Sequence, residues 1–269
     1  MELGLKGKVV VVTGSSKGIG RSIAAAFVRE GCNVVINGRH AKELDSTAAG
    51  LRASATAGGA VHAVASDVAE AGGAKRVVDE TIARFGTIHV LVNNAGGVGR
   101  FGSFEDLTDD EWLGAFTFNV LSAVRATRAA LPHMQKQEWG RVINISSESG
   151  VQPDPVMPHY NASKSAMNSL TKSLSKAYGK DNILVNTVSP AFIRTPLLDG
   201  MLGEQARARG ITVDEAEKAL LREFRPNIVL GRAGRSDETA GIVVFLASDQ
   251  ATFITGSNFR VDGGSVASI

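Results

Sequence analysis

Residues 9–20 read VVVVTGSSKGIG, an apolar run that leads directly into a turn containing Gly14, Gly18 and Gly20. The four valines indicate a buried β-strand, and the residues after the turn carry a helical apolar stripe that stops at Gly31. In such a strand–turn–helix unit, glycines let the backbone and its amide groups approach a pyrophosphate closely. The spacing is Gly-x-x-x-Gly-x-Gly, and taken alone it is equally compatible with a purely structural turn.

Six further β-branched runs follow, with stretches of helix length between them. Their apolar residues are continuous, which indicates strands covered on both faces, and connections of helix length are what parallel strands require. No Pro/Ser-rich linker or repeat interrupts the pattern, so we expect one domain over residues 1–269. The prediction is an α/β fold: a Rossmann-like, doubly wound, parallel seven-stranded sheet with helices on both faces. The expected strands are Val9 to Val12, Val34 to Ile36, Val61 to Val64, Ile88 to Val92, Val142 to Ile145, Ile183 to Val188 and Phe259 to Val261.

The stretch from about residue 196 to residue 225 breaks this rhythm, because it is long for a connection in such a fold. We interpret it as a candidate substrate lid. Its acidic and basic side chains balance one another, so an ordinary solvated helix is the alternative interpretation, and for the charges it is the better one.

Composition excludes several classes of protein. The formal net charge is +2 and the cations are scattered, so no basic stripe favours a nucleic acid partner. Cys32 is the single cysteine, which excludes an internal disulfide and a thiolate metal cluster, and no metal site is expected. No apolar run reaches the roughly 18 to 20 residues that span a bilayer, and the start MELGLKGK lacks a signal-peptide core. We expect a cytoplasmic protein without membrane contact.

Polar residues follow two more of the expected strands. Asp67 and Val68 come after the third strand, where a carboxylate can accept a hydrogen bond from an adenine amino group, and Asn93-Asn94-Ala95-Gly96 ends the fourth. Ligands bind at this carboxyl edge of open α/β sheets. A helix cap for Asp67 and a turn-stabilising amide for Asn93 are the alternatives for each residue taken singly. Together with the glycine turn, the two stretches favour a nucleotide site.

The end of the second strand bears on the choice of nucleotide. An acidic residue there would bind a ribose 2′-hydroxyl and repel a 2′-phosphate, whereas this chain has Gly38 and Arg39. Lys17 in the glycine turn adds a second positive charge. The pattern predicts NADP(H) over NAD(H), although NAD(H) stays possible because either cation can also be ordinary solvated surface.

A second group of residues points to acid–base chemistry. Tyr160 and Lys164 are four residues apart and share one face of a helix, so the ammonium can stabilise a phenolate and lower its pKa towards neutrality. Ser147 ends the fifth strand, where its hydroxyl can bind a substrate oxygen, and Asn119 can hold a water that links Lys164 to solvent. Singly, each has a dull alternative: a chance Tyr-x-x-x-Lys, a helix cap, a surface amide.

Taken together, these stretches, with 186–195 and Val261-Asp262-Gly263-Gly264, resemble the classical short-chain dehydrogenase/reductase family over nearly the whole chain. The resemblance implies that Tyr160 is the acid/base, Lys164 orients the nicotinamide ribose, Ser147 holds the substrate oxygen and Asn119 supports a proton relay. It also implies a homotetramer packed through helices around 107–135 and 160–178. The cofactor-binding residues expected are Gly14, Ser16, Lys17, Gly18, Ile19, Gly20, Arg39, Asp67, Val68, Asn93, Ala95, Gly96, Tyr160, Lys164, Pro190 and Thr195.

The chain departs from the family pattern after the sixth strand, where Pro190 is followed by Ala191 rather than by glycine. Alanine adopts positive φ less easily, so we expect a slightly different loop path and an altered pocket shape. Thr195 still fits the hydroxyl that usually contacts the cofactor there.

The substrate is less clearly encoded. Relatives that reduce 3-oxoacyl groups dock an acidic carrier protein with basic residues, whereas the matching positions here are Glu138 and Asp181, which favours free small molecules. By family placement, we expect a mainly apolar pocket and a hydrophobic ketone or secondary alcohol as substrate. A carrier-protein reductase, a catalytically silent dinucleotide sensor and nucleotide-sugar chemistry are the alternatives, in that order. The expected wall is Gly97, Val98, Gln152, Val156, Met157, His159 and Phe192, with Ser147, Gln152, Val156 and Phe192 as the substrate contacts.

Overall fold

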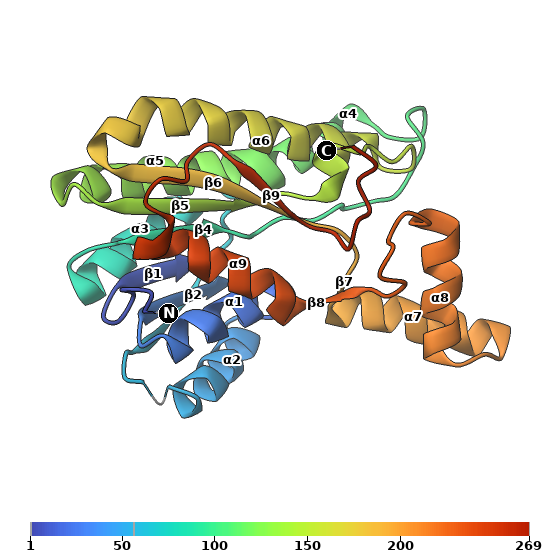
Figure 1. Cartoon of the computed structure of the whole chain (residues 1–269), viewed down its shortest axis with the longest axis horizontal. Coiled ribbons are helices and arrows are strands. Elements are labelled where there is room, and N and C mark those ends of the chain that lie inside the picture. Colours follow the sequence, from blue (N-terminus) through green and yellow to red (C-terminus); the bar gives the residue numbers. More distant parts are fainter. Residues whose placement is uncertain (1, 56, 269) are drawn as a thin grey trace.

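The computed structural model describes residues 2–55 and 57–268 and contains a seven-stranded parallel sheet in the order β3-β2-β1-β4-β5-β6-β9 (Figure 1). The predicted fold class is therefore confirmed, and each expected run lies within or overlaps one strand. The strands are β1 (Val9–Val12), β2 (Asn33–Gly38), β3 (Val61–Ala65), β4 (Val90–Asn93), β5 (Gly140–Ile145), β6 (Ile183–Pro190) and β9 (Asn258–Val261).

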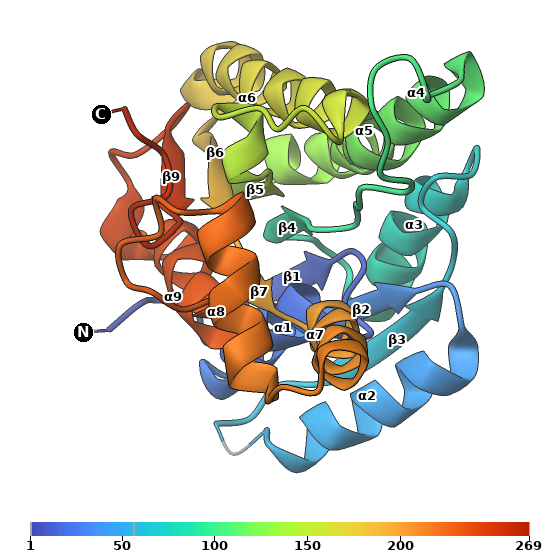
Figure 2. The ribbon, with the colours of Figure 1, turned by 90° about the vertical axis from the view of Figure 1, so that its right-hand side faces the viewer.

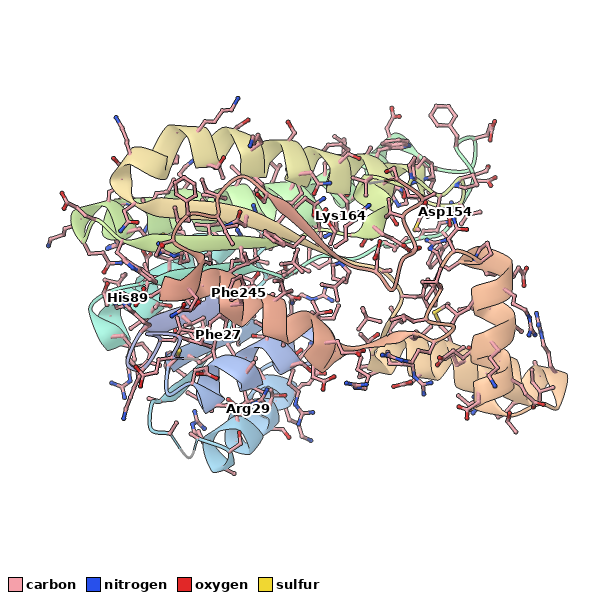
Figure 3. All side chains as sticks on the ribbon, in the orientation of Figure 1. Phe27, Arg29, His89, Asp154, Lys164 and Phe245 are labelled. Atoms are coloured by element: carbon pink, nitrogen blue, oxygen red, sulfur yellow. The ribbon has the colours of Figure 1, made fainter. Side chains whose placement is uncertain are left out.

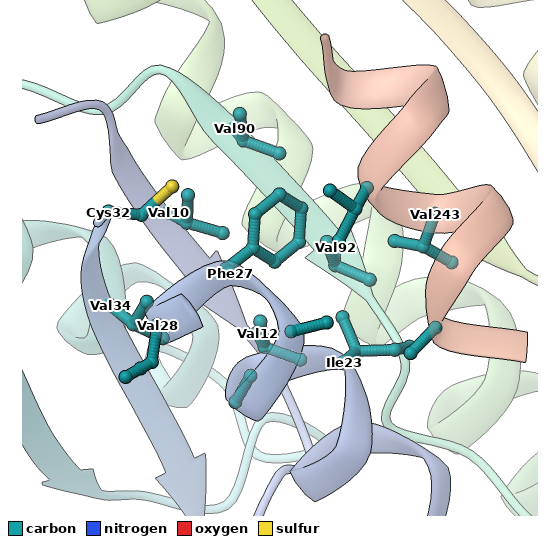
Figure 4. Packing of buried hydrophobic residues seen from close by; sticks show 14 of the residues in the cluster. Val10, Val12, Ile23, Phe27, Val28, Cys32, Val34, Val90, Val92 and Val243 are labelled. Atoms are coloured by element: carbon teal, nitrogen blue, oxygen red, sulfur yellow. The ribbon is translucent and has the colours of Figure 1, made fainter. Parts of the chain in front are cut away.

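Helices cover both faces of this sheet because successive strand residues point to opposite sides. Val10 and Val12 pack under one layer, into which α1 contributes Ile23 and Phe27 (Figure 4), whereas Val11 packs under the other. Every one of these side chains is fully or almost fully removed from solvent. The first layer is α1 (Gly18–Arg29), α2 (Ala41–Ala53) and α9 (Ser236–Ala247), and the second includes α3 (Gly73–Phe85), α5 (Ser122–Lys136) and α6 (Pro158–Tyr178).

The strand order reverses between β1 and β4, which are hydrogen-bonded neighbours although two strands separate them in sequence. At such a switch point, the loops that leave adjacent strands diverge to opposite faces and leave a crevice at the carboxyl edge. The glycine turn after β1 and the turn after β4 flank this crevice. The topology thus places the two predicted nucleotide motifs side by side.

The segment 196–225 forms two helices rather than one, α7 (Pro196–Arg209) and α8 (Val213–Phe224). Between them, Gly210 has a φ of 65°, and the Thr212 side chain caps α8 reciprocally with Glu215. The pair has a small apolar core of its own and lies beyond the sheet (Figures 1 and 2). A parallel bridge between β7 (Ile193–Arg194) and β8 (Gly234–Arg235), which the sequence did not suggest, closes the base of this segment.

Shorter elements complete the chain. The helix α4 (Asp109–Phe116) runs into a single π-turn, η1 (Thr117–Leu121), before α5 begins. Three 3₁₀ turns follow at η2 (Glu148–Gly150), η3 (Gly179–Asp181) and η4 (Asp249–Ala251). Among the described residues, the structure has no helix with the length and apolar character needed to cross a membrane.

Candidate functional site

The glycine turn and the turn after β4 touch each other without intervening side chains. A Cβ atom on Gly14, whose φ is +60°, would lie 2.8 Å from the Cα of Ala95, and a Cβ on Gly20 would lie 2.4 Å from Asn94 Nδ2. Asn94 Nδ2 donates hydrogen bonds to the carbonyls of Thr13 and Gly14, each at 2.9 Å. These glycines are therefore required by close backbone packing as well as by turn conformation.

The amino end of α1 opens towards the crevice. Lys17 occupies its N-cap position but provides no side-chain cap, and Gly18, Ile19 and Gly20 form the first turn. The first amides of a helix have no partner within it, and together with the helix dipole they favour an anion. The backbone here fits a phosphate group.

A cavity of about 400 Å³ extends along this crevice from the glycine turn to Tyr160. It is lined by all but one of the sixteen residues expected to bind a cofactor: Gly14, Ser16, Lys17, Gly18, Ile19, Gly20, Arg39, Asp67, Val68, Ala95, Gly96, Tyr160, Lys164, Pro190 and Thr195. Residues that the sequence analysis missed also line it, among them Asn37, Glu43, Ser66 and Leu197. Asn37 and Ser66 follow strands, so the rule that located Asp67 could have found them.

Asn93, the remaining member of that set, is not among the lining residues. It is buried under α5, where its Nδ2 donates to Thr127 Oγ1 at 3.1 Å and to Asn144 Oδ1 at 2.8 Å. Asn144 in turn donates to Thr171 Oγ1 on α6 at 2.8 Å. This buried chain fastens α5 and α6 to β4 and β5, and the neighbouring Asn94 is the asparagine that lines the cavity.

Two cations mark one end of the cavity. Lys17 Nζ lies 3.6 Å from Glu43 and Arg39 Nη1 lies 3.9 Å from Asp67, with both basic side chains more than half exposed. Ion pairs so long and so exposed contribute little to stability, so either cation can turn to another anion at small cost. Asp67 also accepts a hydrogen bond from the Ala69 amide at 2.9 Å, the local capping role considered as its alternative.

Tyr160 and Lys164 lie together at the other end, in the first turns of α6. Lys164 Nζ is 5.5 Å from the centre of the Tyr160 ring and donates to the carbonyl of Ile145 at 2.9 Å (Figure 3 labels Lys164). Burial lowers the pKa of Lys164 to about 8. Burial also raises the pKa of Tyr160, and hydrogen bonding to Ser147 offsets part of that rise. The pKa of this phenol is thus shifted upwards, against the expectation from the lysine alone, because desolvation of the phenolate dominates.

Ser147 and Asn119 flank this pair. Ser147 lines the cavity, and its hydroxyl also accepts the Ser149 amide at 3.1 Å, so the helix-cap alternative and the cavity position hold together. The Asn119 side chain lies in the π-turn and binds both backbone groups of Gly97, at 2.9 and 3.0 Å. A Cβ on Gly96 would lie 2.6 Å from Asn119 Oδ1 and 3.2 Å from Lys164 Nζ, which shows how tightly the three groups pack.

The expected substrate contacts are more scattered. Ser147 lines the cavity, whereas Gln152 binds the backbone of the C-terminal residues Ser265 and Ala267, each at 3.2 Å. Val156 is 40% exposed, and Phe192 lines a separate pocket of about 230 Å³ between β7 and β9. The loops that carry these residues were placed by family resemblance alone, which does not determine their path.

Comparison with known proteins identifies the chain. A family model described as enoyl-(acyl carrier protein) reductase matches residues 14–266. The NADP-dependent (R)-specific alcohol dehydrogenase of Lentilactobacillus kefiri is 37% identical over 98% of each chain. The 3-oxoacyl-[acyl-carrier-protein] reductase of Thermotoga maritima is 34% identical over 97% of this chain and 99% of the relative. The chain belongs to the short-chain dehydrogenase/reductase family.

The solved structures agree. L-Sorbose reductase from Gluconobacter frateurii, in complex with NADPH and L-sorbose, superimposes with a TM-score of 0.94 at 34% identity, and the match covers all of both chains. This short-chain dehydrogenase/reductase is thus an oxidoreductase, as the resemblance implied.

The depressed pKa of Lys164 predicts how stability depends on pH. Unfolding returns the amine to its ordinary pKa of 10.5, so between about pH 8 and 10.5 the unfolded chain binds more protons, and the stability contribution rises with pH. Lys164→Met removes this titration. Its stability relative to the wild type should therefore decrease by about 2–3 kcal/mol between about pH 7 and pH 10.5. Urea unfolding across this range measures the difference, and a constant offset would contradict the assignment.

Proposed function

We propose that this enzyme interconverts a ketone and a secondary alcohol on a small molecule, with NADP(H) as hydride carrier. The observation that carries the proposal is one continuous cavity, which has the glycine turn and two cations at one end and Tyr160, Lys164 and Ser147 at the other. Such an arrangement brings a reduced nicotinamide and a polarised carbonyl together. The cofactor supplies the hydride chemistry, and the protein supplies position and electrostatics.

The cofactor is NADP(H). The alcohol dehydrogenase relative is NADP-dependent and the L-sorbose reductase structure contains NADPH. In this chain, the carboxyl end of β2 has Gly38 and Arg39 where an acidic residue would repel a 2′-phosphate, and Lys17 lies on the same cavity. The glycine turn and the amino end of α1 would hold the pyrophosphate.

In the proposed mechanism, Tyr160 donates a proton to the substrate oxygen as the ketone is reduced and accepts it in the reverse direction. Its raised pKa keeps the phenol protonated, which is the form that reduction needs. Ser147 donates a hydrogen bond to the same oxygen, Lys164 holds the nicotinamide ribose and stabilises the phenolate, and Asn119 supports the proton relay. Because both Asn119 side-chain groups already bind Gly97, a water at this position would depend on its backbone.

A carrier-bound 3-oxoacyl substrate is the second candidate, favoured by the similarity to the Thermotoga reductase. Glu138 and Asp181 are exposed and close together: Asn182 Nδ2 donates to the Glu138 carbonyl, and Asp181 accepts from Gln135. Two exposed carboxylates repel an acidic carrier, which supports the preference for free small molecules. The apolar side chains near the cavity mouth, including the exposed Leu197 and Val156, support a substrate with a hydrophobic part.

We also propose that the segment 196–225 closes over bound ligand as a lid. Pro196 and Leu197 line the cavity, Leu197 is 75% exposed, and the two helices share an apolar core separate from the sheet. NADPH should therefore slow amide hydrogen exchange in α7, whereas α3 on the opposite side should not respond. Equal exchange in α7 with and without NADPH would contradict a lid. A homotetramer in the cytoplasm completes the proposal, and light scattering gives the mass of the assembly.

Tyr160→Phe tests the acid/base assignment. Loss of the phenolic proton should reduce kcat for ketone reduction at least about a hundredfold, the usual contribution of general acid catalysis, and leave NADPH affinity within about twofold. Tyr178→Phe, at the far end of the same helix, is the matched control and should retain activity. Steady-state kinetics and NADPH fluorescence titration provide the two readouts, and a fully active Tyr160→Phe enzyme would rule out this role.

Arg39→Ala tests the cofactor assignment. Removal of the guanidinium should weaken NADPH binding about tenfold, because a charge-assisted contact with a phosphate is lost, and NADH binding should hardly change. Arg29→Ala removes an exposed arginine from the last turn of α1 and serves as the control. Parallel fluorescence titrations measure both affinities. An equal loss for the two cofactors would show that Arg39 does not read the 2′-phosphate.

A further inference from the structure

Three charged side chains join the lid segment to the loop that follows β5. Arg225, immediately after α8, donates through Nε to Glu148 Oε1 and through Nη1 to Asp154 Oδ2 at 2.7 Å. Glu148 directly follows Ser147, and Asp154 lies further along the same loop (Figure 3 labels Asp154). The guanidinium also lies over the Phe192 ring, 6.0 Å from its centre. The three side chains are called the Arg225 triad below.

The triad is buried. The side chains of Arg225, Glu148 and Asp154 are only 9%, 3% and 13% exposed. Burial of charged groups costs several kcal/mol for each ion and is recovered only by good pairing and further hydrogen bonds. Asp154 meets that condition, because its second oxygen accepts the Val156 amide at 3.1 Å.

Glu148 does not meet it. Its Oε2 is buried and has no hydrogen-bond partner among the residues that the structure describes. A buried carboxylate oxygen without a donor is costly, and such atoms in folded proteins call for a specific explanation. The neighbouring Ser147 lines the cavity, and the charge of Glu148 acts on Tyr160 and contributes to the rise of its pKa. The free oxygen thus belongs to a carboxylate beside the reacting groups.

We infer that Glu148 determines substrate specificity by accepting a hydrogen bond from a hydroxyl group next to the reacting carbonyl. The inference rests on the proposed function and refines it: the substrate is a hydroxyketone or the corresponding diol, rather than a ketone that is apolar throughout. Two carboxylates and one guanidinium leave the triad with one net negative charge, which favours a donor and disfavours a substrate carboxylate.

Arg225 has the role of a positioning residue in this arrangement. By occupying Oε1 and holding Asp154, it fixes the Glu148 carboxylate in one orientation and leaves Oε2 as the acceptor. It also makes the orientation of this acceptor depend on where α8 ends. The lid segment and the choice of substrate are thereby coupled through one side chain.

The test compares hydroxyacetone with acetone, which lacks only the hydroxyl. A hydrogen bond to a charged group contributes about 10- to 100-fold, so wild-type kcat/KM should be higher for hydroxyacetone by that factor. Glu148→Gln should reduce the ratio to below about threefold and change kcat/KM for acetone little. Aminoacetone, in which an ammonium replaces the hydroxyl, is the third substrate; a preference for it over hydroxyacetone would overturn the assignment to a hydroxyl.

The controls separate this inference from the function on which it rests. Glu30→Gln removes an exposed carboxylate after α1 and should leave the substrate ratio unchanged, and an NADPH titration shows whether each variant is folded. Arg225→Lys, which keeps the charge and loses the forked geometry, should give an intermediate ratio. If the ratio is near one in the wild type, or is unaffected by Glu148→Gln, the inference is wrong while ketone reduction stands. If no ketone oxidises NADPH, the proposed function fails and the inference fails with it.

Discussion

The turn after β1 passes the turn after β4 so closely that no side chain fits between them, and the site depends on this contact. Gly14 and Gly20 make the approach possible, and Asn94 fastens the two turns through their carbonyl groups. The contact exists because the strand order reverses at β1 and β4, which brings both turns to one edge. A larger residue at either glycine would move the amino end of α1 away from the cavity.

Burial governs the chemistry at the other end of the cavity. The same desolvation that lowers the pKa of Lys164 raises the pKa of Tyr160, so the two values approach each other from opposite directions. The protein itself therefore favours the neutral phenol, and a lysine one helical turn away does not reverse this. A helical spacing identifies such a pair but cannot give the direction of the shift, because desolvation depends on residues from β5, η2 and α6 that come together only in the fold.

The same distinction separates what could be predicted from what could not. Strand-end residues such as Gly18, Arg39 and Asp67 were found because a parallel sheet brings all carboxyl ends to one edge, whatever the details of packing. Asn93 shows the limit of that rule, because alternate strand residues face opposite layers and its side chain points under α5. Gln152 and Phe192 lie on loops, where the path is set by contacts such as the one with the C-terminal residues. No local pattern encodes those contacts.

The Arg225 triad illustrates how distant residues create a site that no motif announces. Arg225 and Glu148 are 77 positions apart, and each alone resembles one of many solvated charges in the chain. Pairing them in a buried position costs more than an apolar pair of similar size would, so stability does not account for their presence. An arginine that binds one carboxylate oxygen and leaves the other free makes physical sense when a further donor arrives. The cofactor half of this enzyme follows from strand ends and glycines, whereas the substrate half depends on where the lid helices meet the loop after β5.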